Sequence, residues 1–565
     1  MTIRRTCSLT ALSVLLVATG VSAADVDPGV HRRLAEVDTT KVWIHLTDKD
    51  LAGPALDAAL AAAAETLSPR TATRRAQRRT APGLVDQHDL PVAPAYLDTL
   101  ARLGVEPVVV SRWLNAVSAY VDEATLGAIG DLPFVRAIEL VRRGELVDPV
   151  SSAPAALPLG GGFYGLATTQ LEQIGLPALH DTGATGAGIV VGILDTGFKR
   201  DHEAFNNPDH PLTIVAEHDF INDDPDTGPE PGDPSSQHRH GTLILGTLGA
   251  YMPGTLVGGA YDASFILCKT EDTSDEYQGE EDFYVAALEF IEANGGDVAT
   301  SSLRYTDWYT DDDYDGVTAV TSIGVNIATS NGVFCCTSVG NSGHDSNPAT
   351  SNLGAPADAL EVISVGAVES TGEIVGFSSD GPTADGRVKP EVLAQGSGTY
   401  TVDADVPDEY RTASGTSLSC PLVAGAVACL AQAQPGWTVP QMRDLLFRTA
   451  SYFEAFGTFD PLYVEGYGII DAAAANALDC NGNGSPDDED IAGGGSADVD
   501  GDGIPDECQC GPDIDGTGDV GFGDLLAVIS AWGPCTGSCV QDLDGSGDVG
   551  FADLLMVISA WGPCA

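Results

Sequence analysis

Three short motifs place an acid, a histidine and a serine along the chain in that order, each on a turn that contains glycine. They are Asp195-Thr196-Gly197, His240-Gly241-Thr242 and Ser414-Gly415-Thr416-Ser417. An imidazole held by a carboxylate can remove the proton of a serine hydroxyl, and the serine oxygen then attacks a carbonyl carbon. Two other common arrangements of these groups begin with histidine or with serine, so the order found here excludes both.

A fourth residue, Asn341, lies between the histidine and the serine in the run Gly340-Asn341-Ser342-Gly343. Its side-chain amide could hold the negatively charged oxygen that forms when a peptide carbonyl is attacked. The backbone N–H of Ser417 could supply a second donor to the same oxygen. The four groups together predict a site for peptide bond hydrolysis.

Each group has a simpler interpretation when it is taken alone. Asp195 is then a residue of an ordinary turn, and His202 and His238 compete with His240 as the imidazole. We favour His240 because the apolar run 243–248 follows it and predicts a buried helix that carries the ring at its start. The occurrence of all the motifs in one order argues against a set of coincidental turns.

The elements around the motifs predict an α/β fold with a doubly wound, mostly parallel sheet. The apolar runs 189–194 and 332–339 have the composition of buried strands, and they end close to Asp195 and Asn341. Open sheets of this kind place their active sites at the carboxyl ends of the strands, which is where both residues fall.

Further runs fit the alternation of strands and helices. Residues 282–293 have helical spacing, and 297–303 resume an extended pattern. The apolar run 422–431 predicts a helix whose N-terminus points at Ser417, where unpaired amides would favour negative charge. All the candidate catalytic groups therefore fall at strand ends or helix starts.

In order and in motif, residues 163–476 resemble the subtilisin-like serine proteases. The resemblance implies a catalytic domain in which Asp195, His240 and Ser417 form the triad and Asn341 is the oxyanion donor. It also implies that an edge strand borders the substrate cleft and pairs with an extended peptide, and this strand contains Ser301, Ser302 and Leu303.

The segment 24–150 predicts a separate, small α+β domain. Its expected strands and helix cover residues 41–46, 115–121, 123–129 and 135–140, of which 123–129 is the helix. This pattern resembles the inhibitor-like prodomains of subtilisin-like proteases, which implies synthesis as a zymogen.

Two stretches in this part of the chain look like connections. We interpret the arginine-rich tract 70–79 as an exposed linker, in preference to a specific processing site. Residues 151–162 are rich in Pro, Ala and Gly and predict a linker to the catalytic domain.

The N-terminal 23 residues predict a signal peptide, because Arg4 and Arg5 precede the apolar run 9–17 and small residues end at Ala23. We therefore expect a secreted or cell-surface protein. No other stretch approaches the roughly 20 apolar residues of a membrane helix, so we expect no membrane span in the mature form.

The net charge of −56 is distributed unevenly along the chain. Only 10 of the 26 Lys and Arg residues follow residue 150, against 64 of the 82 Asp and Glu residues. An acidic mature surface repels nucleic acid and attracts cations, so we expect protein or peptide substrates and no nucleic-acid partner.

A twelve-residue pattern near the C-terminus occurs twice, at 513–524 and again 29 residues later at 542–553. Its oxygen-bearing side chains and a glycine at position 6 have the spacing of an EF-hand-type calcium loop. The predicted metal ligands are Asp513, Asp515, Thr517, Asp519, Asp524, Asp542, Asp544, Ser546, Asp548 and Asp553.

Apolar helices are expected to follow each loop, over 525–532 and 554–561. With Asp at position 12 and one helix per loop, residues 510–565 resemble two dockerin repeats, and 479–509 resemble acidic thrombospondin type 3 repeats. The resemblance implies Ca²⁺ as the cofactor of the tail, none for the chemistry, and a cohesin-like or cell-envelope partner. The alternative is an acidic, solvated linker.

The cysteines divide into two groups. Equal spacings of 25 residues predict the pairs Cys510–Cys535 and Cys539–Cys564, with Cys480–Cys508 as a third pair. Five more lie in apolar surroundings of the catalytic segment and are expected to be buried and free: Cys268, Cys335, Cys336, Cys420 and Cys429. Cys420, three residues after Ser417, could make the enzyme sensitive to thiol reagents.

Two functions of different class fit the sequence. The first is a secreted serine endopeptidase, made as a zymogen, with a calcium-dependent attachment module. The second is a surface adhesion or scaffold protein that keeps a protease fold without turnover. The complete set Asp195, His240, Asn341 and Ser417 favours the first.

Overall fold

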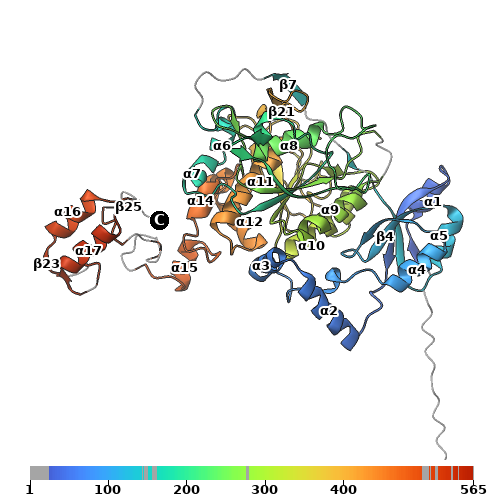
Figure 1. Ribbon diagram of the computed structural model, residues 1–565, viewed down its shortest axis with the longest axis horizontal. Helices are drawn as coiled ribbons and strands as arrows, with labels where there is room; N and C mark the ends of the chain where they lie inside the picture. Colours follow the sequence, from blue (N-terminus) through green and yellow to red (C-terminus); the bar gives the residue numbers. More distant parts are fainter. Residues whose placement is uncertain are drawn as a thin grey trace, which may run out of the picture. The chain divides into compact units, whose positions relative to one another are not determined.

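The structure is a computed structural model, and it describes residues 24–142, 144–145, 150–154, 162–274, 279–498, 505, 508, 511–515, 519–535, 539–544 and 546–563. The predicted signal peptide, residues 1–23, lies outside these ranges. The chain divides into two compact units, one of residues 1–62 and 87–141 and the other of 63–86 and 142–565 (Figure 1).

The first unit is a five-stranded sheet in the order β1-β5-β2-β4-β3, with helices packed on it. The strands are β1 (Asp25–Val26), β2 (Thr40–Leu46), β3 (Pro107–Ser111), β4 (Ala116–Val121) and β5 (Val135–Leu140). The helices are α1 (Pro28–Leu34), α4 (Pro94–Arg102) and α5 (Glu123–Gly130), while α2 (Pro54–Thr66) crosses into the second unit. All seven residues of the central strand β2 are buried. The three strands and the helix expected in 24–150 are confirmed.

The second unit is built on a seven-stranded sheet in the order β11-β14-β8-β15-β17-β18-β19, in which every neighbouring pair is parallel. Its strands are β8 (Val190–Asp195), β11 (Thr213–Asp219), β14 (Ser264–Lys269), β15 (Val298–Ser301), β17 (Phe334–Ser338), β18 (Ile363–Val368) and β19 (Val392–Gln395). β8 is buried along its whole length, as a strand covered on both faces must be.

Two pairs of long helices pack against this sheet. The helices α8 (Arg239–Gly249) and α11 (Thr416–Ala433) contact each other, as do α9 (Glu281–Ala293) and α10 (Val320–Ser330). Gly192 of β8 lets α9 approach closely, because an added Cβ would lie 2.5 Å from Ile291. The predicted doubly wound, mostly parallel sheet is confirmed.

Smaller elements complete the second unit. They are α6 (Thr168–Glu172), α7 (Leu176–Asp181), α12 (Val439–Arg448), α13 (Ser451–Phe456), α14 (Ala472–Ala477), β9 (Asn206–Asn207), β10 (His210–Pro211), β12 (Tyr251–Met252) and β13 (Leu256–Val257). Among the described helices, α11 alone is long and apolar enough to cross a membrane by length and composition, and 89% of it is buried inside the protein.

Two short strands from just before the catalytic segment pair with strands of the second unit. β6 (Gly144–Glu145) is antiparallel to β16 (Arg304–Tyr305). β7 (Val150–Pro154) is antiparallel to β21 (Tyr410–Ser414), which also pairs with β20 (Thr399–Val402). The first residues of the predicted linker, 151–154, thus belong to a strand.

The expectation of an exposed linker at 70–79 is wrong. The tract forms helix α3 (Pro69–Arg78), capped by the Ser68 side chain, which accepts from the backbone N–H of Thr71 at 3.1 Å. Arg74, Arg75 and Arg78 are only 2–3% exposed. Their charges are balanced by carboxylates more than 200 residues away in sequence, which local composition does not reveal.

The C-terminal part contains α15 (Asp487–Gly493) and two interlocked repeats. Each repeat has one main helix, α16 (Phe522–Ser530) or α17 (Phe551–Ser559), which begins three residues before the position expected from the sequence. Antiparallel pairs join β22 (Asp519–Val520) to β25 (Gly562–Pro563) and β23 (Gly533–Pro534) to β24 (Asp548–Val549). Four valines, at 520, 528, 549 and 557, form the small buried core.

The expected disulfide Cys480–Cys508 is confirmed. The pairs Cys510–Cys535 and Cys539–Cys564 are wrong, because Cys535 is joined to Cys539. The pairing of β23 with β24 brings the end of one repeat onto the other, with the backbone N–H of Cys535 donating to Gly547 at 2.9 Å. Cys510 and Cys564 lie outside the described residues.

Candidate active site

Asp195 and His240 meet in the interior of the second unit. Asp195 is the last residue of β8, and His240 lies in the first turn of α8; they are 0% and 2% exposed. Nδ1 of His240 donates to the Asp195 carboxylate, at 2.8 Å from Oδ1 and 2.9 Å from Oδ2. The carboxylate is itself held by the backbone N–H of Thr196 at 2.7 Å. This pair fixes the tautomer of the ring and directs Nε2 away from the aspartate.

The glycine after the histidine allows this close approach. A Cβ on Gly241 would lie 2.4 Å from the backbone oxygen of Gly197 and 3.1 Å from Cβ of Asp195. Any larger residue would push α8 away from the end of β8. The motif His240-Gly241 is therefore explained by packing as well as by chemistry.

The two competing histidines have other partners. Nε2 of His202 donates to the backbone oxygen of Glu409 at 2.8 Å, and its Nδ1 accepts from Ala204. Nε2 of His238 lies 3.3 Å from Asp233 Oδ2, and burial lowers the pKa of this imidazole. Neither histidine is paired with Asp195, so the geometry favours His240.

Ser417 and Asn341 are brought together at the start of α11. Ser417 is the second residue of this helix and is 2% exposed. Oδ1 of Asn341 accepts from the backbone N–H of Thr416 at 2.8 Å and from its hydroxyl at 2.9 Å. These bonds orient the amide, and a Cβ on Gly415 would lie 3.3 Å from Asn341 Nδ2. The amide NH₂ of Asn341 is thus directed to the serine turn.

The predicted substrate edge adjoins the serine. The hydroxyl of Ser302 donates to the backbone oxygen of Ser417 at 3.0 Å. Ser301 ends β15, and the chain continues through Leu303 into β16, which pairs with the two-residue strand β6. The expectation of an edge strand is wrong for Ser301, because β15 pairs with β8 on one side and β17 on the other. The main-chain pairing with an extended segment is made by β16, which follows Leu303.

A buried carboxyl group near Asp195 was not predicted from the sequence. The Tyr305 hydroxyl donates to Glu271 Oε1 at 2.7 Å, and Gln237 Nε2 donates to the backbone oxygens of Thr196 and Glu271. Burial raises the pKa of Glu271 to about 7, and the nearby Asp195 charge adds to this effect. The residue lies in an acidic stretch that resembles a solvated loop, so the sequence carries no signal of its burial.

The five cysteines of the catalytic segment, from Cys268 to Cys429, are buried and free, as expected. Cys420 lies beside β15, with its Sγ 3.4 Å from the Thr300 hydroxyl and 3.6 Å from the Ser301 backbone oxygen. Burial raises the pKa of the Cys420 thiol to about 12. A protonated, inaccessible thiol does not support the predicted sensitivity to thiol reagents.

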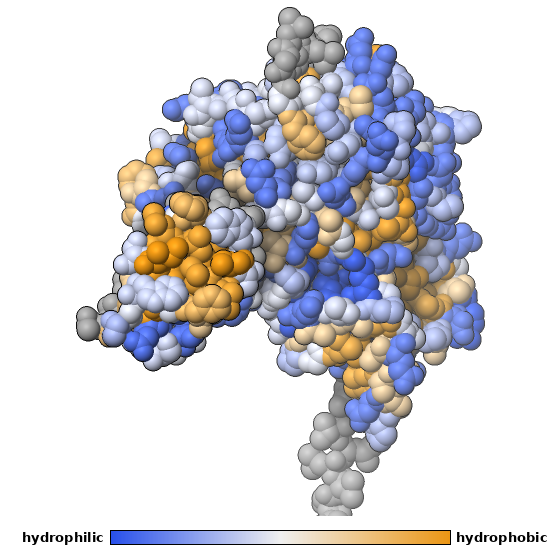
Figure 2. All heavy atoms as spheres, turned by 60° about the vertical axis from the view of Figure 1, so that its left-hand side comes forward, coloured by the Kyte–Doolittle hydropathy of each residue, from blue (hydrophilic) through white to orange (hydrophobic). Residues whose placement is uncertain are grey.

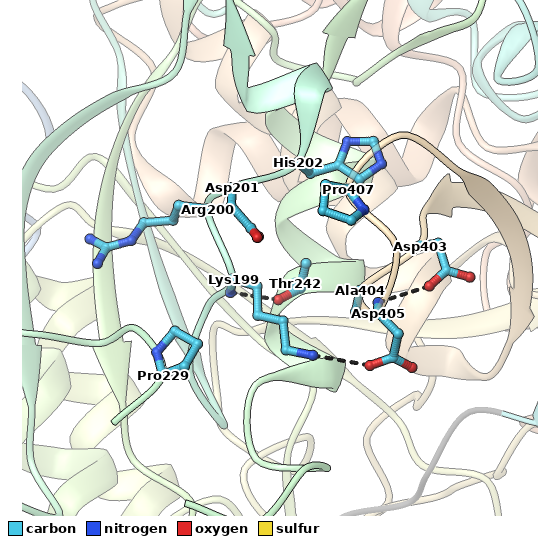
Figure 3. Close-up of a pocket in the computed structure, with 10 residues that line it drawn as sticks. All are labelled: Lys199, Arg200, Asp201, His202, Pro229, Thr242, Asp403, Ala404, Asp405 and Pro407. Atoms are coloured by element: carbon cyan, nitrogen blue, oxygen red, sulfur yellow. Dashed lines mark hydrogen bonds and ion pairs between the residues drawn. The ribbon is translucent and has the colours of Figure 1, made fainter. Parts of the chain in front are cut away.

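A pocket of about 580 Å³ lies beside the first turns of α8 (Figure 3). Its wall includes Thr242, whose hydroxyl accepts from the Lys199 backbone N–H at 2.8 Å. The Lys199 ammonium group contacts Asp405 Oδ1 at 3.0 Å across the pocket. Asp201 and Asp403 also line it, so charged side chains form a large part of its wall.

In each C-terminal repeat, carboxylate oxygens converge from three of the predicted ligands. The groups are Asp513, Asp515 and Asp524 in the first repeat and Asp542, Asp544 and Asp553 in the second, with oxygens within 4.8 Å of one another. Thr517 and the side chain of Asp519 lie outside the described part, Ser546 hydrogen-bonds Asp542, and Asp548 is exposed. The donor set is hard oxygen throughout, which fits Ca²⁺.

The last residue of each loop is buried and oriented by the backbone. Asp524 and Asp553 are both 1% exposed. Asp524 accepts from the N–H groups of Ile514 and Gly521, and Asp553 accepts from those of Asp544 and Gly550. These bonds lower the pKa of both carboxyls against the effect of burial.

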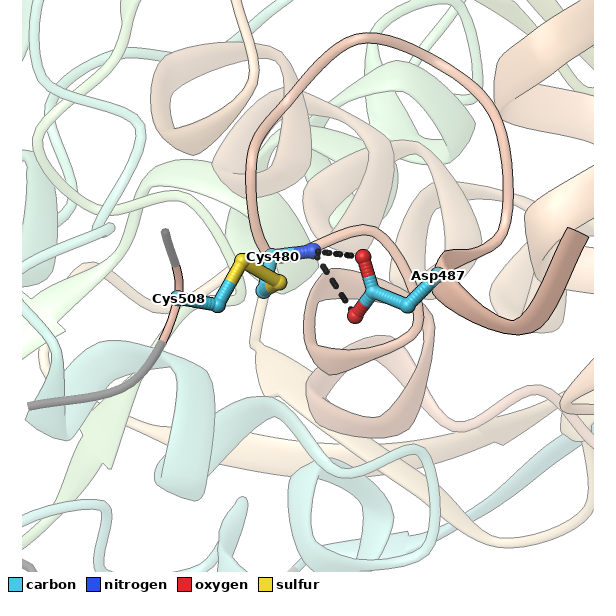
Figure 4. A group of neighbouring side chains, drawn as sticks. All are labelled: Cys480, Asp487 and Cys508. Atoms are coloured by element: carbon cyan, nitrogen blue, oxygen red, sulfur yellow. Dashed lines mark hydrogen bonds between the residues drawn. A yellow bond between two sulfur atoms is a disulfide. The ribbon is translucent and has the colours of Figure 1, made fainter. Parts of the chain in front are cut away.

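Cys480, Asp487 and Cys508 also cluster, but they do not form a thiolate metal site (Figure 4). The two sulfurs are bonded to each other, and the Asp487 carboxylate accepts from the backbone N–H of Cys480 at 3.1 Å. The preceding residue, Asp479, is 0% exposed and accepts from Trp437 Nε1 at 2.6 Å. This hydrogen bond ties the start of the acidic segment 479–484 to α12.

Comparisons with known proteins cover both units. A model described as the subtilase family matches residues 186–484, and one described as the peptidase S8 propeptide domain of Bacteroidota matches residues 41–153. Subtilisin E of Bacillus subtilis (strain 168) is 30% identical over 367 residues, which are 64% of this chain and 81% of subtilisin E. Subtilisin of Bacillus pumilus is 31% identical over 307 residues, 54% of this chain and 97% of that one.

Among solved structures, fervidolysin from Fervidobacterium pennivorans, a keratinolytic enzyme related to subtilisin, matches with a TM-score of 0.53 and 22% identity. The match covers 68% of this chain and 60% of fervidolysin, and it shows a common fold. Since the family model spans more than half of the sequence and the curated relatives agree with it, this chain belongs to the subtilase family of serine endopeptidases and carries a propeptide domain of peptidase S8.

Proposed function

We propose that this protein is exported as a zymogen and hydrolyses peptide bonds through Asp195, His240 and Ser417, with Asn341 as oxyanion donor. The observation that carries the proposal is the buried hydrogen bond from His240 Nδ1 to the Asp195 carboxylate, at 2.8 Å. A scaffold protein without turnover has no need of a buried imidazole that is oriented by a carboxylate.

In this mechanism, His240 takes the Ser417 proton as the serine oxygen attacks the substrate carbonyl, and it later gives the proton to the leaving amine. Asp195 holds the ring and stabilises the imidazolium. The developing oxyanion accepts from Asn341 Nδ2 and from the N–H of Ser417, and removing one such donor typically slows turnover by about 10² to 10³. The chemistry requires no cofactor.

Substrates are proteins or peptides that bind in extended form. We assign the segment from Ser302 through Leu303 into β16 to main-chain pairing with the residues before the cleaved bond, because β16 already pairs in this way with β6. We assign the charged pocket around Lys199 and Asp405 to side chains after that bond, since it lies beside the helix that carries His240.

The C-terminal repeats are proposed to bind two Ca²⁺ ions and to attach the enzyme to a cohesin-like or cell-envelope partner. Figure 2 shows apolar side chains gathered on their surface. Four equivalent positions on or beside each helix are between 48% and 71% exposed, namely Phe522, Leu526, Ile529 and Trp532 in the first repeat and Phe551, Leu555, Ile558 and Trp561 in the second. Exposed apolar patches of this kind mark protein contacts.

Casein cleavage by the matured protein tests the peptidase. The Ser417→Ala variant and a serine-directed inhibitor should each abolish cleavage. Ser330→Ala, at the end of α10, is the matched control and should leave the rate unchanged, because this hydroxyl bonds only within its own helix. Absence of cleavage by the wild-type protein after propeptide removal, with calcium present, would support the adhesion or scaffold alternative.

A further inference from the structure

The arginines of α3 form one stripe along the helix. Arg70, Arg74 and Arg78 are four residues apart, with Arg75 beside them, so all four side chains leave the helix on the same side. Thr71 lies on this side too and is 0% exposed. A helix with four cations on its buried face needs a partner surface that is rich in acceptors.

The partner surface is made by the ends of three helices. At the end of α9, the Thr71 hydroxyl donates to the backbone oxygen of Glu292 at 3.2 Å. The Arg74 guanidinium lies 3.4 Å from the Asn331 backbone oxygen, which follows α10. Arg78 reaches the Ala431 backbone oxygen in the last turn of α11, at 3.3 Å. Helix C-termini carry unpaired carbonyl groups and partial negative charge, which cations neutralise.

Two buried carboxylates complete this surface. Glu292, 1% exposed, accepts from Arg74 and, at 2.9 Å, from Arg75 Nε. Asp297, 5% exposed, is paired with Arg70 and, at 3.4 Å, with Arg78. Losing one side of a buried ion pair leaves an uncompensated charge and is strongly destabilising. Two carboxylates and the carbonyl oxygens at the helix ends thus hold the four arginines of α3, and we call this partner surface the α3 receptor.

The receptor lies at the end of the sheet away from the catalytic residues. Asp297 precedes the first residue of β15, and its Oδ2 accepts from the N–H of Val190, the first residue of β8, at 3.1 Å. Asp195 is the last residue of β8. The α3 contact is thus separate from strands β16 and β21, with which the propeptide tail pairs through β6 and β7.

We propose that α3 is a second anchor of the propeptide, an arginine helix that caps α9, α10 and α11 and keeps the propeptide bound after the chain has been cut at the active site. Cutting frees the tail of the propeptide but does not touch α3. Release of α3 is then a separate step of activation, and the vacated receptor binds a helix with arginines at this spacing. The activation step rests on the proposed peptidase function, while the anchoring does not.

The test uses the full chain with Ser417→Ala, so that no self-cleavage occurs, and with the recognition sequence of an added protease inserted between Glu145 and Val150. After the cut, size-exclusion chromatography should show the two pieces together. Native mass spectrometry after dilution then gives the rate at which they separate. Early separation of the unmodified pieces would overturn the proposal.

Arg74→Gln, Arg75→Gln and Arg78→Gln together should raise this rate more than about tenfold, because each leaves buried acceptors unpaired. The control replaces Arg32, Arg33 and Arg102 of the first unit by Gln, the same change in charge, and should not alter the rate. An unchanged rate in the first variant would refute the anchor.

If the triple variant does not fold, as judged by its melting curve before cutting, the single variants Arg78→Gln and Glu292→Gln take its place with the same expectation. None of these rates depends on catalysis. If the matured protein does not cleave casein but the two pieces separate slowly, at a rate that depends on the arginines, the proposed peptidase function is rejected and the proposed anchor is supported.

Discussion

At the scale of single residues, the strongest argument is the length and burial of one hydrogen bond. Nδ1 of His240 lies close to both Asp195 oxygens, and this contact fixes the orientation of the ring. Asp195 is 0% exposed and His240 is 2% exposed, so the hydrogen bond is shielded from solvent. This makes the carboxylate the group that sets the tautomer and stabilises the charged ring. The serine needs both effects.

Asp195→Asn should lower the rate of casein cleavage by roughly 10³- to 10⁴-fold with little change in the melting temperature. The amide is almost isosteric, but it can present an N–H to the ring and so favour the wrong tautomer. The rate is measured on matured protein, with the exposed Asp209→Asn, which does not line the pocket, as control. Equal rates for wild type and Asp195→Asn would remove Asp195 from the triad.

Glu271 gives a second residue-scale prediction, concerning pH. Its pKa is raised by burial from the ordinary 4.5 to about 7. At a pH between these two values, the Glu271 carboxyl is deprotonated in the unfolded chain and protonated in the folded chain. The contribution of Glu271 to the free energy of unfolding therefore falls as the pH rises from about 4.5 to about 7, and it is constant above pH 7. At about 1.4 kcal/mol per tenfold change in proton affinity, the loss is of order 3 kcal/mol.

Urea unfolding of the Ser417→Ala chain at pH 5 and pH 8 measures this loss. Glu271→Gln keeps an acceptor for the Tyr305 hydroxyl and removes the ionisation, so the difference between the two pH values should shrink. Part of the difference remains, because burial also raises the pKa of the neighbouring Glu280. The exposed Glu172→Gln is the control; if it reduces the difference as much as Glu271→Gln, Glu271 is not its source.

The residues that could be predicted from sequence are those whose position is fixed by a nearby turn. Asp195, His240 and Ser417 each lie where a strand ends or a helix begins, beside a glycine, so a few neighbouring residues report their setting. Glu271 and the α3 arginines could not be predicted in this way. Their burial depends on partners such as Tyr305 and Glu292, which the fold supplies from distant parts of the chain.

At the scale of elements, periodicity predicted the strands and helices well, but it did not predict pairings. The extended character of β8 and the helical spacing of α9 follow from apolar spacing alone, and both are confirmed within one or two residues. Strands β6 and β7 carry little apolar signal, being held by main-chain bonds to β16 and β21. The disulfide pairs predicted for the repeats were wrong for the same reason, because the observed pair depends on the antiparallel pairing of β23 with β24.

These pairings predict where the propeptide is cut. Glu145 pairs with Arg304, just after the substrate edge, and Val150 pairs with Ser414, three residues before Ser417. Because β6 pairs beside the proposed substrate segment and β7 pairs with the strand that leads to Ser417, we expect the cut between these two strands. N-terminal sequencing of the matured protein should begin within 146–150, and the Ser417→Ala chain should remain intact. A mature N-terminus at the arginine tract or within 155–162 would contradict this assignment.

At the scale of the whole molecule, basic and acidic residues are concentrated in different parts of the chain. Residues 1–150 supply most of the Lys and Arg residues of the chain, and α3 buries Arg74, Arg75 and Arg78 against carboxylates of the acidic catalytic segment. The C-terminal repeats take no part in these ion pairs. Their buried core consists of four valines, which is too small to stabilise two helices by itself. Their order should therefore depend on the cation that their carboxylates bind, whereas the order of the catalytic unit should not depend on these repeats.

Calcium titration of the full Ser417→Ala chain, followed by amide hydrogen exchange, should show protection of α16 and α17 rising as Ca²⁺ binds. Asp524→Asn with Asp553→Asn removes one buried carboxylate from each loop and should abolish that rise, since Asp at this position both binds the cation and accepts from the loop backbone. In an otherwise wild-type chain, the same double variant should cleave casein at an unchanged rate. The exposed pair Asp488→Asn and Glu489→Gln on α15 serves as the control for charge.

Protection that is insensitive to Ca²⁺ in the wild-type repeats would reject the loops as calcium sites. A casein rate that falls only in the Asp524/Asp553 variant would show instead that the repeats support the catalytic unit directly.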